Sequence, residues 1–166
     1  LDNSKLSEVM MWLYNYTFAK EIYKKRTVNN LYIDDIYYTS AKDNLAGISD
    51  RKKMRLRWYG QDNITNQLFF EIKKKIGRIG YKKIYPINSS KKNTMDLNIK
   101  NILIQCNKEL EKNNLYFDEY LTPTLYTSYD REYYSDTDGI RITIDKNIHF
   151  YRPLIYKKLN EIITTP

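Results

Sequence analysis

The feature that most constrains the fold of this chain is a strict alternation of charged and apolar residues in several short segments. In residues 53–59, the charged or tyrosine positions alternate with apolar ones: Lys53, Arg55, Arg57 and Tyr59 against Met54, Leu56 and Trp58. Residues 69–76 and 140–145 repeat the pattern. Because successive side chains of a strand point to opposite faces, the spacing predicts β-strands with one charged and one apolar face.

The remaining segments predict a fold of the α+β class. Apolar residues at helical spacing predict helices around 6–13 and 99–110. Strands are expected over 31–39, 52–60, 68–76, 80–87, 120–134 and 140–151. Most of these strands follow one another through short loops, which favours an antiparallel sheet with flanking helices. The length of 166 residues is that of one domain, expected over residues 1–166.

Composition excludes several classes of site. The only cysteine, Cys106, excludes a disulfide framework and a Cys-rich zinc site, and the only histidine, His149, removes most histidine-based catalysis. Lys and Arg number 28 against 20 Asp and Glu, a net charge of +8 that indicates a polyanionic partner. Nucleic acid, membrane headgroups, nucleotides and inorganic phosphates all remain open at this point. The sequence contains no apolar stretch of membrane-spanning length and no signal peptide, so a cytoplasmic location is expected.

The charged strand faces narrow this choice. An ordinary solvated face is the alternative for any one strand, but arginines recur at alternate positions on segments expected to be neighbours. The planar guanidinium suits phosphate oxygens, and like charges across strands need an anion to offset them. That anion is either a carboxylate, Glu71 or Asp145, or a bound ligand. A sheet curled with these faces inward would bind phosphates, and phosphoryl transfer there requires neither histidine nor cysteine.

Five sequence runs together resemble a known family. They are VNNLYIDD (28–35), GISDRKKMRLRWYG (47–60), FFEIKKKIGRIGYKKIYPI (69–87), LTPTLYTSYDREYY (121–134) and GIRITIDKNIHFYR (139–152). In order and spacing they resemble the VTC domain of inorganic polyphosphate polymerases, a member of the triphosphate tunnel metalloenzyme superfamily. The resemblance implies an antiparallel, barrel-like tunnel that binds ATP, tripolyphosphate or polyphosphate with Mg²⁺ or Mn²⁺. It also implies transfer of the γ-phosphate of ATP to a growing chain.

The resemblance also implies roles for particular residues. Phosphate binding is carried over to Lys53, Arg55, Arg57, Lys73, Lys82, Arg131 and Arg141. Five of these are implied in catalysis: Arg55, Arg57, Lys73, Arg131 and Arg141. Glu71 is the candidate metal ligand, with Asp145 a weaker one that could instead pair with an arginine.

The sequence departs from the family pattern at both ends. The family's opening strand and its closing acidic strand, which carries the principal metal ligand, are not found in this sequence. We therefore expect an incompletely closed tunnel, a fragment of a longer domain, whose open sheet edge favours a homodimer. A triphosphatase, a nucleotide cyclase and a non-catalytic phosphate-binding module remain alternatives to a polymerase. Nucleic-acid binding is disfavoured because the basic residues alternate along strands while the tyrosines scatter over both faces and the helices.

Overall fold

One six-stranded antiparallel sheet organises the chain, in the order β4-β3-β2-β1-β5-β6. The structure is a computed structural model that describes residues 3–60, 67–87, 97–113, 121–159 and 161. The strands are β1 (Lys20–Asp34), β2 (Arg51–Tyr59), β3 (Leu68–Ile76), β4 (Ile79–Ile87), β5 (Thr122–Ser135) and β6 (Arg141–Tyr151). The helices are α1 (Asn3–Tyr16), α2 (Thr39–Leu45) and α3 (Ile99–Lys112). This architecture confirms the α+β prediction.

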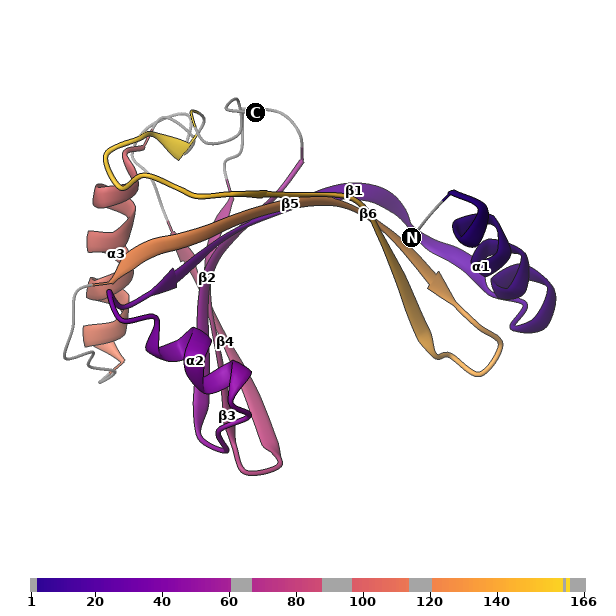
Figure 1. Cartoon of the computed structure of the whole chain (residues 1–166), viewed down its shortest axis with the longest axis horizontal. Coiled ribbons are helices and arrows are strands. Elements are labelled where there is room, and N and C mark those ends of the chain that lie inside the picture. Colours follow the sequence, from indigo (N-terminus) through magenta and orange to yellow (C-terminus); the bar gives the residue numbers. More distant parts are fainter. Residues whose placement is uncertain (1–2, 61–66, 88–96, 114–120, 160, 162–166) are drawn as a thin grey trace.

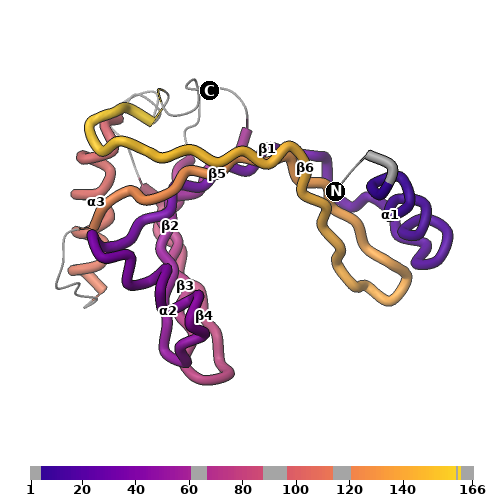
Figure 2. Tube along the Cα trace, viewed as in Figure 1, coloured from indigo at the N-terminus to yellow at the C-terminus, as the bar shows by residue number. Residues whose placement is uncertain are grey.

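The sheet forms an arch rather than a closed barrel (Figures 1 and 2). Strands β1 and β5 pair along almost their whole lengths and form the crown, while β2 pairs only with the second half of β1, from Val28 to Ile33. The β2–β4 strands descend from one end of the crown and the β5–β6 hairpin bends down at the other. Register shifts near Tyr23 accompany this bend, as expected for β-bulges. Among the described residues, β4 and β6 are the two unpaired edges, so the expected incomplete closure is confirmed.

The hydrophobic core lies on the outer side of the arch. Helix α3 packs there against the apolar residues of β1, β2 and β3, in a cluster that includes Leu31, Ile33, Met54, Leu56, Trp58, Phe70, Ile72, Ile102 and Cys106. At the other end α1 buries Leu13 against Tyr134. Because these residues share one face of the sheet, the charged faces predicted from the alternation lie on the inner side of the arch.

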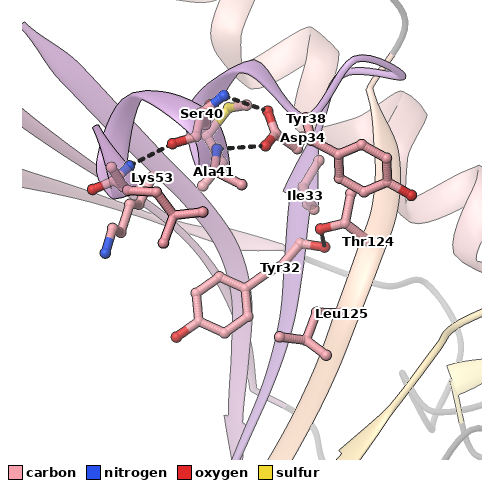
Figure 3. A pocket seen from close by; sticks show the side chains of 12 residues that line it. Tyr32, Ile33, Asp34, Tyr38, Ser40, Ala41, Lys53, Thr124 and Leu125 are labelled. Carbon is pink, nitrogen blue, oxygen red and sulfur yellow. Dashed lines mark hydrogen bonds between the residues drawn. The ribbon is translucent and has the colours of Figure 1, made fainter. Parts of the chain in front are cut away.

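The structure differs from the predicted elements at the first strand and in the segment that follows it. Strand β1 begins at Lys20 and ends at Asp34, whereas the sequence predicted residues 31–39. The segment after it is helix α2, which has no apolar stripe and was not predicted. The Asp34 carboxylate accepts hydrogen bonds from the backbone N–H groups of Ser40 and Ala41 (Figure 3), which holds α2 against the end of β1. Residue 120, the expected start of the fifth strand, lies outside the described residues, and β5 begins at Thr122.

The described helices are short. Helices α1 and α3 have 14 residues each and α2 has seven. In the part of the chain that the structure describes, no helix has both the length and the apolar character needed to cross a membrane.

Candidate functional site

The sheet register gathers the predicted phosphate-binding residues of three strands on the inner face. Arg55 of β2 lies opposite Glu71 of β3, and Lys53 lies opposite Lys73. Lys73 in turn lies opposite Lys82 of β4. Neighbouring strands therefore place like charges directly side by side, an arrangement that is unfavourable without an anion between them.

Glu71 is the internal anion of this group. We refer to Arg55, Arg57, Glu71, Lys73 and Lys82 as the Glu71 cluster. Arg55 donates to Oε2 of Glu71 from Nε at 2.8 Å, with its Nη2 at 2.6 Å from the same oxygen, and Lys82 Nζ donates to Oε1 at 2.6 Å. Arg57 Nη1 lies 3.8 Å from Oε2. The carboxylate is 3% exposed, so both of its oxygens are committed to cations inside the protein.

The electrostatics of the Glu71 cluster leave it short of negative charge. Burial opposes ionisation of Glu71, but hydrogen bonds from Lys82 and Arg55 hold the pKa of its carboxyl below the ordinary value. The pKa of the Lys73 ammonium is lowered by burial and then by the neighbouring charges of Arg55 and Lys82. Glu71 is thus the one carboxylate in a cluster with four cations, and among the described residues it lies within ion-pair distance of three of them, Arg55, Arg57 and Lys82.

A series of hydrogen bonds between buried polar side chains connects this cluster to the crown of the arch. Arg57 Nε donates to Asn30 Oδ1 at 2.9 Å, and Asn30 Nδ2 donates to Thr127 Oγ1 at 3.1 Å. All three residues are buried, on β2, β1 and β5 respectively. These bonds fix the direction of the Arg57 guanidinium, because a buried amide with satisfied partners has little freedom to turn.

Arg131 and Asp145, predicted from β5 and β6, form a separate ion pair. Arg131 Nε and Nη2 donate to the two carboxylate oxygens of Asp145 at 2.6 and 2.7 Å. This hydrogen-bonded pair raises the pKa of the Arg131 guanidinium. Both side chains remain partly exposed, at 25% and 30%. The Asp145 carboxylate therefore neutralises an arginine, the alternative that the sequence left open for it.

Sequence reasoning missed Arg26, which the structure places next to Arg131 on the inner face. Arg26 Nε donates to the Tyr133 hydroxyl at 2.8 Å, and its guanidinium lies 4.3 Å from the centroid of the Tyr59 ring. Arg141 lies over the Tyr23 ring, with 5.9 Å between the guanidinium and the ring centroid. We refer to Tyr23, Arg26, Tyr59, Tyr133 and Arg141 as the Arg26 cluster.

Hollows of similar size adjoin the two clusters. A hollow of about 500 Å³ beside β2, β3 and β4 is lined mainly by basic residues, among them Lys53, Lys73 and Lys82. Another of about 500 Å³ is lined by Tyr133, Tyr23, Arg26, Arg141 and the neighbouring lysines. A third, of about 460 Å³, lies between α2 and the strands and reaches Lys53 (Figure 3).

The described side chains do not fit a divalent metal site. No group of three His, Cys, Asp or Glu residues that could hold a metal ion occurs in the part of the chain that the structure describes. Both oxygens of Glu71 already accept hydrogen bonds from cations, and those of Asp145 accept from Arg131. A second cation at either carboxylate would meet this positive charge at close range. Among the described residues, these carboxylates are therefore bound to arginine and lysine side chains and do not form a metal-ligand set.

The model of one known protein family matches nearly the whole chain. The family model of the VTC domain matches residues 2–164, a range that contains every strand and every predicted site residue. No curated protein matches the chain.

Proposed function

The chain belongs to the VTC domain family, which gives it a polyphosphate-related role, and we propose that it binds condensed phosphates on the inner face of the arch. The observation that carries this proposal is the charge imbalance of the Glu71 cluster, where one buried carboxylate faces four cations. A phosphate chain supplies the missing negative charge in a form that arginine and lysine recognise well.

Glu71 prepares the cluster for this ligand. By holding Arg55 and Lys82 through short hydrogen bonds, it fixes two cations in place before a phosphate arrives. The Lys73 side chain reaches solvent, and partial desolvation together with the neighbouring cations lowers the pKa of its ammonium, so a nearby anion would stabilise its charged form. Binding therefore needs little rearrangement, and its free energy comes mainly from relieving repulsion among these cations.

We further propose that the parent activity is phosphoryl transfer, from the γ-position of ATP to the terminal oxygen of a phosphate chain. The bond between the γ-phosphorus and its bridging oxygen breaks, ADP leaves, and a new phosphoanhydride bond forms. Arginine and lysine side chains at Arg55, Arg57 and Lys73 would hold the reacting phosphates and balance the charge that spreads over them. Binding of Mg²⁺ or Mn²⁺, which the family resemblance implies, remains a prediction for this chain.

Titration of the chain with tripolyphosphate tests the binding proposal. The variant Lys73→Gln is compared with Lys83→Gln, since both lysines are exposed on the β3–β4 hairpin and lie on opposite faces of the sheet. We expect Lys73→Gln to lower the affinity about tenfold, the usual scale for a charge-assisted hydrogen bond, and Lys83→Gln to leave it within about twofold. Equal losses in the two variants would show that only net charge matters, which contradicts the proposal.

The transfer proposal has its own test. The chain, and the same chain extended at both ends, are incubated with ATP and Mn²⁺, and the products are resolved by phosphorus NMR. Signals from internal phosphates of a growing chain support transfer to polyphosphate. Orthophosphate alone would identify a triphosphatase, and a cyclic nucleotide would identify a cyclase. Tripolyphosphate binding without turnover in both chains would leave a binding module and refute the transferase.

The open sheet edges also support a proposal about assembly. Strand β6 pairs with β5 on one side, and no described strand pairs with its other side. It exposes Ile148 and Phe150, at 50% and 63%. We propose that a second copy of the chain pairs with this edge. Sedimentation of the wild type and of Phe150→Lys tests this: a dimer that dissociates in the variant is expected, and a wild-type monomer at high concentration would refute it.

A further inference from the structure

The outer side of the β3–β4 hairpin carries an exposed surface of apolar and basic residues. The turn of this hairpin lies at the end of β3 and β4 that is away from the crown of the arch (Figures 1 and 2). The hydrophobic core on the outer side ends at Ile72, which is 7% exposed. Beyond it, the register places five residues on the same face, which we call the hairpin patch: Lys74, Ile76, Ile79, Tyr81 and Lys83.

The polarity of the hairpin patch changes in order along the hairpin. Ile76 and Ile79 face each other at the turn, 49% and 75% exposed, and the next pair on this face is Lys74 and Tyr81, the tyrosine 45% exposed. Along the backbone, Tyr81 lies about 7 Å and Lys83 about 13 Å behind Ile79, because a strand rises about 3.3 Å per residue. Apolar side chains at the tip, followed by an aromatic ring and then by lysines, match the order of polarity across a lipid headgroup region.

The charge of the hairpin is of one sign. Residues 73–83 contain six Lys or Arg and no Asp or Glu. Two of the six belong to the Glu71 cluster on the inner face, and the other four are Lys74, Lys75, Arg78 and Lys83. Among the described residues, Lys74 forms an ion pair with Asp50 at 3.7 Å, and the other three form none. The tip of the hairpin therefore complements an anionic surface.

We propose that the hairpin patch docks the chain on an anionic lipid surface, with Ile76 and Ile79 inserted among the headgroups and the lysines beside the lipid phosphates. The basic side chains attract the surface, and burial of the isoleucines holds the chain there. Nucleic acid fits the patch less well, because isoleucine neither stacks on a base nor pairs with a phosphate. This inference goes beyond the proposed function, because phosphate-chain binding is proposed for the opposite face of the sheet.

Sedimentation of the whole chain with lipid vesicles tests the inference. Vesicles of phosphatidylcholine with about one quarter phosphatidylserine should bind the wild type at least about tenfold more tightly than vesicles of phosphatidylcholine alone. For the anionic vesicles, Ile79→Ser should lower the affinity about tenfold, because an inserted apolar side chain is lost. Lys83→Gln should lower it about fivefold, the scale of one basic residue near such a surface.

Helix α3 offers a matched control for each variant. Ile104 is 45% exposed and Lys108 is exposed, and both lie on α3, outside the hairpin patch. Ile104→Ser and Lys108→Gln should therefore leave vesicle affinity within about twofold of the wild type. Circular dichroism and melting temperature verify that each variant is folded, which is expected for Ile79→Ser because this side chain is 75% exposed.

The outcomes separate this inference from the proposed function. Lys83→Gln should weaken vesicle binding and leave tripolyphosphate binding unchanged, whereas Lys73→Gln should do the reverse. If the wild type does not bind the anionic vesicles, or if Ile79→Ser binds them as the wild type does, the inference is refuted and the proposed function stands. Vesicle binding that depends on Lys73 as strongly as on Lys83 would assign the lipid contact to the inner face and would also refute it. Duplex DNA bound through Ile79 and Lys83, where vesicles are not bound, would make the patch a nucleic-acid site instead.

Discussion

The two ends of the inner face hold their arginines by different means. In the Glu71 cluster a buried carboxylate bonds Arg55 and Lys82 and so links three strands. In the Arg26 cluster tyrosine rings and one hydroxyl hold guanidinium groups that lack a carboxylate partner among the described residues. The first arrangement makes the basic side chains part of the fold, and the second leaves them largely independent of it. Stability should therefore depend strongly on these contacts at the Glu71 cluster and little on them at the Arg26 cluster.

The largest expected effect is on stability and comes from Glu71→Gln. Losing this buried carboxylate leaves Arg55, Arg57 and Lys82 to repel one another, and breaking such a pair costs about 3 kcal/mol. Urea unfolding of the variant measures it. Asp145→Asn is the matched control, because its pair with Arg131 is partly exposed and should contribute no more than about 1 kcal/mol. Equal destabilisation by both variants would remove the distinction between the two ends.

The same carboxylate predicts how stability changes with acid. Because the pKa of Glu71 is lower in the folded chain than its ordinary 4.5, its stabilisation is complete above pH 4.5 and is lost as the pH falls through the folded value. The free energy of unfolding of Glu71→Gln should therefore decline less steeply with acid than that of the wild type. Parallel curves for the two proteins would contradict the assigned role of Glu71.

An effect on ligand affinity is expected at alkaline pH. The pKa of Lys73 is lowered from 10.5 by burial and by neighbouring cations, and phosphate binding favours its charged form. As the pH rises, Lys73 should therefore begin to lose its charge at a pH lower than 10.5. The affinity for tripolyphosphate should fall with it, by up to about tenfold once this charge is lost. Lys73→Arg keeps its charge over this range and should bind with a flatter pH dependence. A decline of the same size in wild type and Lys73→Arg would exclude Lys73 as its source.

The smallest expected effect is at Tyr133. Tyr133→Phe removes the hydroxyl that orients Arg26 and keeps the ring, so the free energy of unfolding in urea should fall by no more than about 1 kcal/mol, the scale of one hydrogen bond. Tyr129→Phe, on the same strand and face, is the control. Addition of Tyr133→Phe to Arg26→Gln should cause no further loss beyond that of Arg26→Gln alone. Additive losses would show that Tyr133 acts independently of Arg26.

The sequence predicted one end of this face far better than the other. Strands β2 and β3 alternate charge and hydrophobicity without interruption, because one face packs on α3 and the other lines the arch. Their faces could be assigned from the sequence. The first half of β1 has no such alternation, since register shifts near Tyr23 change the phase of the pleat. Arg26 follows these shifts, so its place on the inner face depended on pairing with β5 that no local pattern revealed.

Helix α2 was missed for a related reason. Its seven residues have no apolar stripe, and it depends on the Asp34 carboxylate, which binds the backbone of Ser40 and Ala41. An aspartate shortly before a Thr-Ser pair was the one available signal for a helix start. From the alternation of charge, the sequence could predict that Glu71 and Asp145 would offset basic residues on neighbouring strands. Which cations each carboxylate takes depended on the register of four strands.

A crystal structure of the chain with bound tripolyphosphate tests the central claim most directly. The account predicts phosphate oxygens within hydrogen-bond distance of Lys73 and Arg55 on the inner face of the arch, with Glu71 still bonded to Lys82. Phosphates bound on the outer face beside Lys83, or displacement of Glu71 from its cations by the ligand, would contradict it.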